Sequence, residues 1–172
     1  NHIITTKTEH HAVLNTCEYL EKYEGCEVTY LDVDEYGMVN PEDVENAIRE
    51  DTLLITVMHA NNEIGTINPI EDIGKIARKH NIYFHTDACQ AAGYCDLDVE
   101  KLNVDMMSVN GSKVYGTKGV GILYVKTGLQ LVPLIHGGGQ ERNLRSGTEN
   151  VSGIMGFAKA LELAQSERES EV

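Results

Sequence analysis

Apolar positions along the chain follow two spacings, one typical of strands and one typical of helices. Short apolar or β-branched runs predict strands over 2–5, 26–31, 53–58, 82–86, 105–109 and 119–126. Apolar residues three and four apart predict helices over 9–23, after Pro41, after Pro69 and around Phe157. Strands that alternate with helices indicate an α/β fold, a three-layer α/β/α arrangement around a mainly parallel sheet.

Asparagine followed by proline marks two of the predicted helix starts, Asn40-Pro41 and Asn68-Pro69. Asparagine is a good N-cap and proline is favoured at the first helical position, so we expect each asparagine to cap its helix. The buried faces expected for the last two helices are Ile70, Ile73 and Ala77, and then Ile154, Phe157, Ala158 and Leu161.

Composition limits the classes of function. The 172 residues correspond to about one domain, and the sequence opens at Asn1, so we expect a piece of a longer chain. The net charge of -13 argues against binding to nucleic acid or to an anionic membrane surface, because both require a positive field. No apolar stretch approaches the roughly 18 to 20 residues needed to cross a bilayer.

Cysteines and histidines are spaced without a metal-binding pattern. Cys17, Cys26, Cys89 and Cys95 form no CxxC pair, so neither a zinc site nor a disulfide framework is expected. They are predicted to be small buried residues in a reducing, cytoplasmic compartment. The seven histidines are dispersed, and we expect no metal site.

Chemically active side chains follow several predicted strands. Ligands of parallel sheets bind beyond the carboxyl ends of the strands, so we expect these side chains to meet at one edge. The set contains a carboxylate, an amine, an imidazole and amides: His10, Asn61-Asn62-Glu63, Asp87, Gln90, Asn110, Ser112 and Lys113.

Lys113 and Asp87 each allow two interpretations. Asp87 is either a local cap or salt-bridge partner, or a functional acid, and Lys113 is either a solvated loop residue or a reactive amine. A partly desolvated lysine can form an imine, and a carboxylate can face a pyridinium nitrogen. Together they would be the protein half of pyridoxal phosphate chemistry.

Glycine-rich segments suggest other ligands. The glycines at 116, 119 and 121 lack the GxGxxG spacing, and Gly111-Ser112-Lys113 lacks the rest of a P-loop, so nucleotide binding is not expected. The glycines at 137–139 precede two arginines and two hydroxyls that form either an anion site or a mobile surface loop: Arg142, Arg145, Ser146 and Thr148.

Six segments occur in an order that resembles one enzyme family. They are TEHHAVL (8–14), MHANNEIG (58–65), HTDACQ (85–90), NGSKVYG (110–116), GGGQER (137–142) and RSGTEN (145–150). This set resembles the cysteine desulfurases of the class V aminotransferase family, in the branch that serves iron–sulfur cluster assembly. The resemblance covers essentially the whole chain and implies the large domain of the fold-type I transferases that depend on pyridoxal 5'-phosphate.

The resemblance implies a role for individual residues in a homodimer with shared sites. Lys113 would form the imine with the cofactor, Asp87 would pair with the pyridine nitrogen, and His10 would stack on the ring and move protons. The remaining contacts would be Asn62 and Gln90 to the ring hydroxyl or substrate side, and Thr148 to the phosphate bound by the neighbouring subunit.

Two departures from the family are visible. Members often carry Ser-Gly-His-Lys where this chain has Asn110-Gly111-Ser112-Lys113, and both changed positions contact phosphate in the family. Asn110 and Ser112 still offer hydrogen-bond donors, so we expect them to keep that role. The family's N-terminal phosphate turn and its C-terminal domain, with a nucleophilic cysteine and a substrate arginine, have no match within residues 1–172.

The activity implied is removal of sulfur from L-cysteine, which yields L-alanine and an enzyme persulfide. The sulfur would pass to an acceptor or to an iron–sulfur scaffold protein. Two alternatives remain open from the residues: a selenocysteine lyase or other class V aminotransferase, and a fragment without catalytic function.

Overall fold

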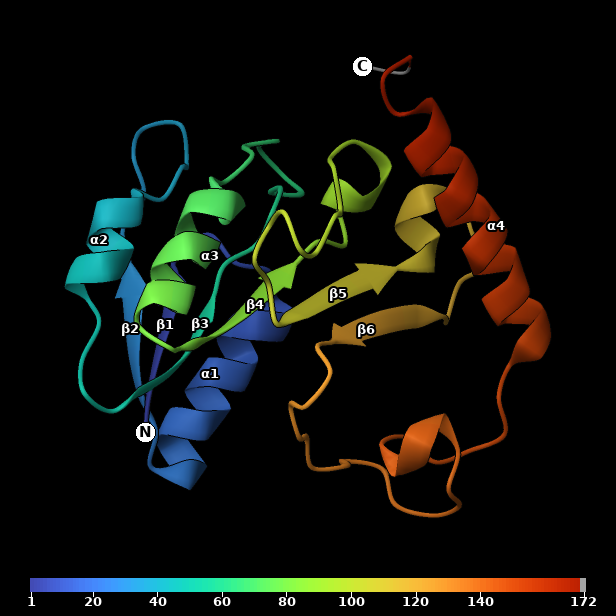
Figure 1. The fold of residues 1–172 in the computed structure, drawn as a ribbon, viewed down its shortest axis with the longest axis horizontal. Helices are drawn as coiled ribbons and strands as arrows, with labels where there is room; N and C mark the ends of the chain where they lie inside the picture. Colours follow the sequence, from blue (N-terminus) through green and yellow to red (C-terminus); the bar gives the residue numbers. More distant parts are fainter. Residues whose placement is uncertain (171–172) are drawn as a thin grey trace.

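The computed structural model describes residues 1–170, which form a six-stranded sheet with helices around it (Figure 1). The strands lie in the order β2-β1-β3-β4-β5-β6, and all neighbours are parallel except the antiparallel pair β5 and β6. The mainly parallel sheet predicted from the sequence is confirmed, and each predicted strand overlaps an observed one. The strands are β1 (His2–Thr6), β2 (Glu27–Leu31), β3 (Thr52–Thr56), β4 (Tyr83–Asp87), β5 (Met106–Asn110) and β6 (Gly121–Val125).

Helices cover both faces of this sheet. The chain runs from β1 through α1 to β2 at one edge, then returns through α2 to β3 and continues through α3 to β4. Parallel crossovers are right-handed, so the reversal of direction places α1 on one face and α2 and α3 on the other, as Figure 1 shows. Within residues 1–170 the helices are α1 (His11–Glu24), α2 (Pro41–Asn46), α3 (Ile70–Lys79) and α4 (Val151–Glu167), with short 3₁₀ helices η1 (Ala91–Gly93), η2 (Gly111–Val114) and η3 (Glu141–Asn143).

One apolar cluster joins the helices to the sheet. Ile70, Ile73 and Ala77 of α3 are buried, as their spacing predicts. They belong to the same cluster as Ile55 of β3 and Phe84 of β4, both fully buried. Burial of each large apolar side chain stabilises the fold by roughly 1.5–3 kcal/mol. No helix of residues 1–170 is both long enough and apolar enough to span a membrane.

Of the two asparagines predicted to cap a helix, one does so and the other does not. Asn40 caps α2 through its side chain, as predicted. The prediction for Asn68 is wrong, because Pro69 occupies the cap position of α3 and no side chain caps that helix. Asn68 is buried instead, where its amide accepts a hydrogen bond from the Val39 N–H (3.1 Å) and donates one to the Met58 carbonyl (2.9 Å). Its hydrogen-bonding capacity is used to join neighbouring loops.

The predicted buried face of α4 is partly wrong. Phe157 is buried and Leu161 packs against the core, as expected. Ile154 is 39% exposed and Ala158 is also exposed, whereas Ala160 packs against the core. The face is displaced because α4 lies against η1 and η2, beyond the ends of the strands, rather than against the sheet itself.

Gly74 of α3 lies where a methyl group has no room. A Cβ there would meet the backbone carbonyl oxygen of Leu102 and lie 2.9 Å from the Cβ of Asn103. We expect Gly74→Ala to lower the free energy of unfolding by about 1–3 kcal/mol, the usual cost of overpacking, as measured by urea denaturation. Gly93→Ala is the control, because a Cβ at that position meets nothing within 4 Å. Equal losses in the two variants would contradict this steric explanation.

Candidate active site

The candidate residues lie at the carboxyl edge of the sheet. The chain leaves β1 towards one side of the sheet and β3 towards the other, so the region beyond these two strand ends, which we call the crevice, is a topological switch point. Ligands of open α/β sheets bind in such crevices. Four segments border it: residues 7–10 after β1, 57–62 after β3, 87–90 at the end of β4 and 110–113 at the end of β5.

Asp87 is the last residue of β4 and is half-buried. Its Oδ1 accepts a hydrogen bond from the Cys89 N–H (2.9 Å), and its main-chain carbonyl accepts one from the His59 N–H (2.9 Å). Its Oδ2 has no hydrogen-bond or ion-pair partner in residues 1–170. One carboxylate oxygen is therefore fixed in place, and the other is available to a ligand.

Lys113 lies in η2, the tight turn that follows β5. Asn110 caps this turn by accepting hydrogen bonds at Oδ1 from the Ser112 N–H (3.0 Å) and from the Ser112 hydroxyl (2.9 Å). The Lys113 side chain is exposed and has no ion-pair or hydrogen-bond partner in the described part of the chain, unlike Lys126, which pairs with Asp105. The amine is therefore solvated in the described structure, unlike the partly desolvated lysine considered from the sequence, and no described side chain holds it.

Lys113 and Asp87 lie at the same edge because β4 and β5 pair in parallel, and the thiol of Cys89 lies near both charges. The pKa of this thiol rises to about 12, mainly because it is buried and secondly because the Asp87 carboxylate is near, while the Lys113 ammonium opposes the rise. Both charges therefore act on one buried sulfur atom. The sheet brings an acid and an amine that are 26 positions apart in the sequence to a single crevice.

His10 is the N-cap of α1 and is exposed. Its Nδ1 accepts a hydrogen bond from the Ala12 N–H (3.1 Å). The lone pair of Nδ1 is thereby used, so the neutral ring carries its proton on Nε2. The imidazole is held by its own helix, with a defined nitrogen available for proton transfer.

The amide side chains divide into structural and available groups. Asn61 is buried and fully used: Nδ2 donates to the Thr8 carbonyl (2.9 Å), and Oδ1 accepts from the Glu63 N–H (2.9 Å) and the Ile64 N–H (3.0 Å). Asn62 is exposed and Gln90 is half-buried, and neither side chain has a hydrogen-bond partner within residues 1–170. The structure thus distinguishes two adjacent asparagines that the sequence treats alike.

Thr148 is the candidate that this chain does not bring to the crevice. It is exposed in the segment between η3 and α4, beyond β6 in Figure 1, and bonds to no other candidate residue in the described structure. In the same segment the Arg145 guanidinium donates to the Ser146 carbonyl (2.7 Å), and the buried Ser146 hydroxyl donates to the Ile135 carbonyl (3.0 Å). Of the proposed anion-binding groups, these two are used locally.

Glu9 is a site residue that the sequence analysis missed. It is only 6% exposed, and its Oε1 accepts hydrogen bonds from the Thr6 hydroxyl (3.0 Å) and the Met58 N–H (2.7 Å). Burial raises its pKa to about 7, and the Asp87 charge adds to the rise. A glutamate next to a helix start is usually solvated, so only its position directly before His10 could have pointed to a role.

Two other histidines lie near the crevice, and one of them, His85, holds strands together. His85 of β4 bridges the Thr56 hydroxyl (2.8 Å) and the Ser108 hydroxyl (2.9 Å), so it joins three neighbouring strands. His59 is buried, and its Nδ1 has no partner within residues 1–170. Burial lowers the pKa of both imidazoles. No group of three or more metal-ligating side chains occurs in the described residues.

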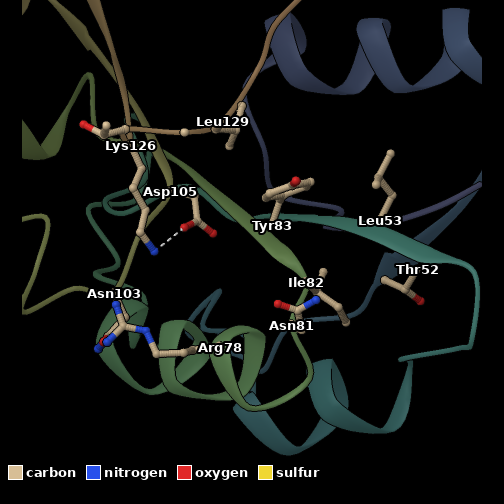
Figure 2. Close-up of a pocket in the computed structure, with 12 residues that line it drawn as sticks. Thr52, Leu53, Arg78, Asn81, Ile82, Tyr83, Asn103, Asp105, Lys126 and Leu129 are labelled. Carbon is tan, nitrogen blue, oxygen red and sulfur yellow. Dashed lines mark hydrogen bonds and ion pairs between the residues drawn. The ribbon is translucent and has the colours of Figure 1, made fainter.

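A cavity of about 610 Å³ lies at the opposite edge of the sheet, at the amino ends of β3, β4 and β5 (Figure 2). Leu53 and Tyr83 line it together with the ion pair between Lys126 Nζ and Asp105 Oδ1 (2.9 Å). None of the described residues that line it belongs to the candidate set. This cavity is therefore separate from the site at the carboxyl edge.

Known proteins similar to this chain come from a single family. A sequence profile described as Aminotransferase class-V matches residues 1–171. The cysteine desulfurase IscS of Clostridium botulinum (strain Hall) is 59% identical over 164 residues, which cover 95% of this chain and 41% of that protein. The chain thus spans about two fifths of the length of the curated relatives it matches.

Solved structures agree with the sequence comparison. A structure described as a NifS-like protein matches with a TM-score of 0.95 and 49% identity, over 99% of this chain and 47% of that one. A structure described as SspA in complex with cysteine matches with a TM-score of 0.91 and 52% identity, over 94% of this chain and 47% of that one.

The buried carboxyl of Glu9 makes stability depend on pH. Its pKa of about 7 lies above the ordinary value of 4.5, so folding favours the protonated form. The resulting contribution is complete below about pH 4.5 and is lost as the pH rises through 7. At ~1.4 kcal/mol per tenfold change in proton affinity, the loss is about 3 kcal/mol.

We expect the difference in free energy of unfolding between wild type and Glu9→Gln to fall as the pH rises from about 5 to 8. Urea denaturation at several pH values measures this difference. Subtracting the free energy of unfolding of the variant from that of the wild type cancels the contributions of His59 and His85. Their lowered pKa values make stability change with pH in the opposite direction. A difference that stays constant with pH would show that Glu9 is not buried as described.

Proposed function

Because the chain belongs to the class-V aminotransferase family, we propose that it forms the cofactor-binding large domain of a cysteine desulfurase. The reaction is the pyridoxal 5'-phosphate-dependent removal of sulfur from L-cysteine, which leaves L-alanine and a persulfide for iron–sulfur cluster or thio-cofactor synthesis. The observation that supports this proposal is the parallel pairing of β4 and β5, which puts Asp87 at the end of one strand and Lys113 in the turn after its neighbour, at the same edge of the sheet.

The residues of the crevice fit pyridoxal phosphate. Lys113 offers an unpaired amine, and Asp87 offers an unused carboxylate oxygen, in both cases judged over residues 1–170. When bound, the cofactor supplies an aldehyde that combines with amines and a ring that accepts the electron pair of a breaking bond. An amine and an anion at one edge are the two protein groups that this chemistry requires.

Each available side chain has a task in this arrangement. Asp87 keeps a negative charge facing the ring nitrogen and so holds a proton there. His10, with its proton on Nε2, moves protons at the face of the ring. Asn62 and Gln90 contact the ring hydroxyl or the substrate through amides that no other described residue uses.

Asn110 and Ser112 support binding of the cofactor phosphate. The Oδ1 of Asn110 is occupied by the Ser112 backbone and hydroxyl, which leaves the two N–H groups of Nδ2 as donors. This pair replaces the serine and histidine of the family pattern with a preformed turn of its own. A free donor is therefore retained at Asn110, whereas the Ser112 N–H and hydroxyl both donate to Asn110 Oδ1 and serve to hold the turn.

None of the four cysteines is suited to receive the sulfur. Cys17 and Cys95 are buried, and burial raises the pKa of Cys89 to about 12, so its thiolate is scarce at neutral pH. Cys26 lies just before β2, at the amino edge of the sheet. We therefore place the sulfur-accepting thiol outside residues 1–172, together with the groups that recognise the acceptor protein.

The proposal also concerns the compartment in which the enzyme works and the choice between related activities. All four cysteines are unpaired, which fits a reducing, cytoplasmic compartment. The similar proteins are named as cysteine desulfurases, which favours this activity over a selenocysteine lyase or another class V aminotransferase. Residues 1–172 alone are expected to be inactive, because the sulfur-accepting thiol is proposed to lie outside them.

Replacement of Lys113 tests the proposal directly. In the full-length protein, we expect Lys113→Ala to abolish alanine and sulfide production from L-cysteine and to leave no cofactor attached at this position after borohydride reduction, as measured by peptide mass spectrometry. Lys22→Ala is the matched control, since Lys22 is exposed in the last turn of α1, where the chain has returned to the amino edge of the sheet. Cofactor trapped on a different lysine in the wild-type protein would contradict the assignment.

Thr148 tests the shared site of the proposed homodimer. We expect Thr148→Ala to weaken cofactor binding in the full-length protein because one donor to the phosphate is lost. When it is mixed and refolded with Lys113→Ala, the heterodimer regains one intact site, so activity returns to as much as about half of the wild-type value per active heterodimer. Absence of any recovery in verified heterodimers would place Thr148 and Lys113 in the same subunit's site or remove Thr148 from it.

A further inference from the structure

Glu9 is held at the junction of two strand ends and is not used by the chemistry proposed above. It lies three residues beyond the end of β1, directly before His10. Its Oε1 accepts from the Thr6 hydroxyl on its own segment and from the Met58 N–H on the segment after β3. One buried oxygen atom therefore joins the two loops on either side of the switch point.

The connection continues from Met58 to the candidate acid. The next residue, His59, donates its N–H to the main-chain carbonyl of Asp87 (2.9 Å). The loops after β1 and β3 are also joined by the hydrogen bond from Asn61 Nδ2 to the Thr8 carbonyl (2.9 Å). A continuous series of backbone-anchored hydrogen bonds thus runs from the residue before His10 to Asp87.

The second oxygen of Glu9 has no partner. Its Oε2 is buried and makes no hydrogen bond with any described residue. A buried acceptor without a partner costs roughly 1–3 kcal/mol, and such features in native structures call for an explanation. Support of the ligand crevice would explain why a carboxyl group is placed here at a cost to stability.

We infer that Glu9 is a positioning residue that sets the distance and orientation of His10 relative to Asp87, and so shapes the slot between them for a flat ring. This inference rests on the proposed function, because it assigns the slot to the cofactor. Glu9 does not touch the cofactor: it acts through Met58 and through its own neighbour His10. Loss of its Oε1 removes one of the links between the loop after β1 and the loop after β3 and leaves the bond from Asn61 to Thr8.

Two substitutions separate this role from simple stabilisation. Glu9→Ala removes the acceptor, whereas Glu9→Gln keeps a side-chain oxygen that can accept from Thr6 and Met58. In the full-length protein we expect Glu9→Ala to weaken binding of pyridoxal phosphate by about tenfold or more, equivalent to ~1.4 kcal/mol. We expect Glu9→Gln to bind within about threefold of wild type, and spectroscopic titration of the apoprotein with the cofactor measures both.

Asp105→Ala provides a matched control for loss of stability. Asp105 also joins two segments of the sheet, because its Oδ2 accepts from the Phe84 N–H (3.0 Å) and its Oδ1 pairs with Lys126. It does so at the opposite edge, beside the cavity of Figure 2. We expect this variant to lower the melting temperature as Glu9→Ala does but to leave cofactor affinity unchanged.

The visible circular dichroism of the bound cofactor gives a second readout. It reports the asymmetry of the ring's surroundings, so we expect it to change in Glu9→Ala and to be restored in Glu9→Gln. Wild-type affinity and an unchanged signal in Glu9→Ala, with only a lower melting temperature, would overturn the inference. If Glu9→Ala does not fold, Glu9→Asp, whose carboxyl is one methylene shorter, takes its place with the same expectations. Failure of the wild-type protein to bind the cofactor would instead refute the proposed function.

Discussion

Parallel pairing of β1, β3, β4 and β5 is the constraint on which the whole site depends. Each of these strands ends at the same edge, so residues far apart in the sequence meet there although no sequence pattern links them directly. Asp87 ends β4 and Lys113 follows β5, and the pairing of these two strands fixes their separation. The antiparallel β6 adds an edge strand but contributes none of the candidate groups.

At the carboxyl edge of the sheet, some polar side chains use their hydrogen-bonding atoms within the fold, and others keep atoms that no described residue uses. Asn61, Asn68 and His85 use their hydrogen-bonding capacity within the fold and join neighbouring loops or strands. Asp87 keeps one carboxylate oxygen free, and Lys113 has no partner in the described residues. The satisfied groups give the crevice rigidity, and the free groups give it the capacity to bind an anionic, ring-shaped ligand.

Much of the fold could be predicted from the sequence because apolar periodicity follows burial directly. The face of α3 was predictable for this reason, since Ile70, Ile73 and Ala77 lie on one stripe of a helix that covers a flat sheet. The face of α4 was harder, because that helix packs on irregular turns. Asn68 was misjudged because a capping signal is local, whereas its actual partners, Val39 and Met58, lie 29 and 10 positions away in the sequence.

The candidate site was predictable in part, for a related reason. Strand ends can be read from the sequence, so Asp87 and the segment containing Lys113 could be placed at one edge. Glu9 could not, because its burial depends on the Met58 N–H, a backbone group without a sequence signature. The resemblance selects Asn62 rather than Asn61 for the cofactor, and the structure supplies the physical reason, since Asn61 turns back to the Thr8 carbonyl.

A crystal structure of the full-length protein grown with pyridoxal phosphate tests the central claim most directly. We expect one cofactor ring in the crevice beyond β4 and β5, with an Asp87 carboxylate oxygen within about 2.7–3.2 Å of the ring nitrogen and Lys113 Nζ bonded to the cofactor. A cofactor bound at the amino edge, or a ring that contacts only one of these two residues, would contradict it.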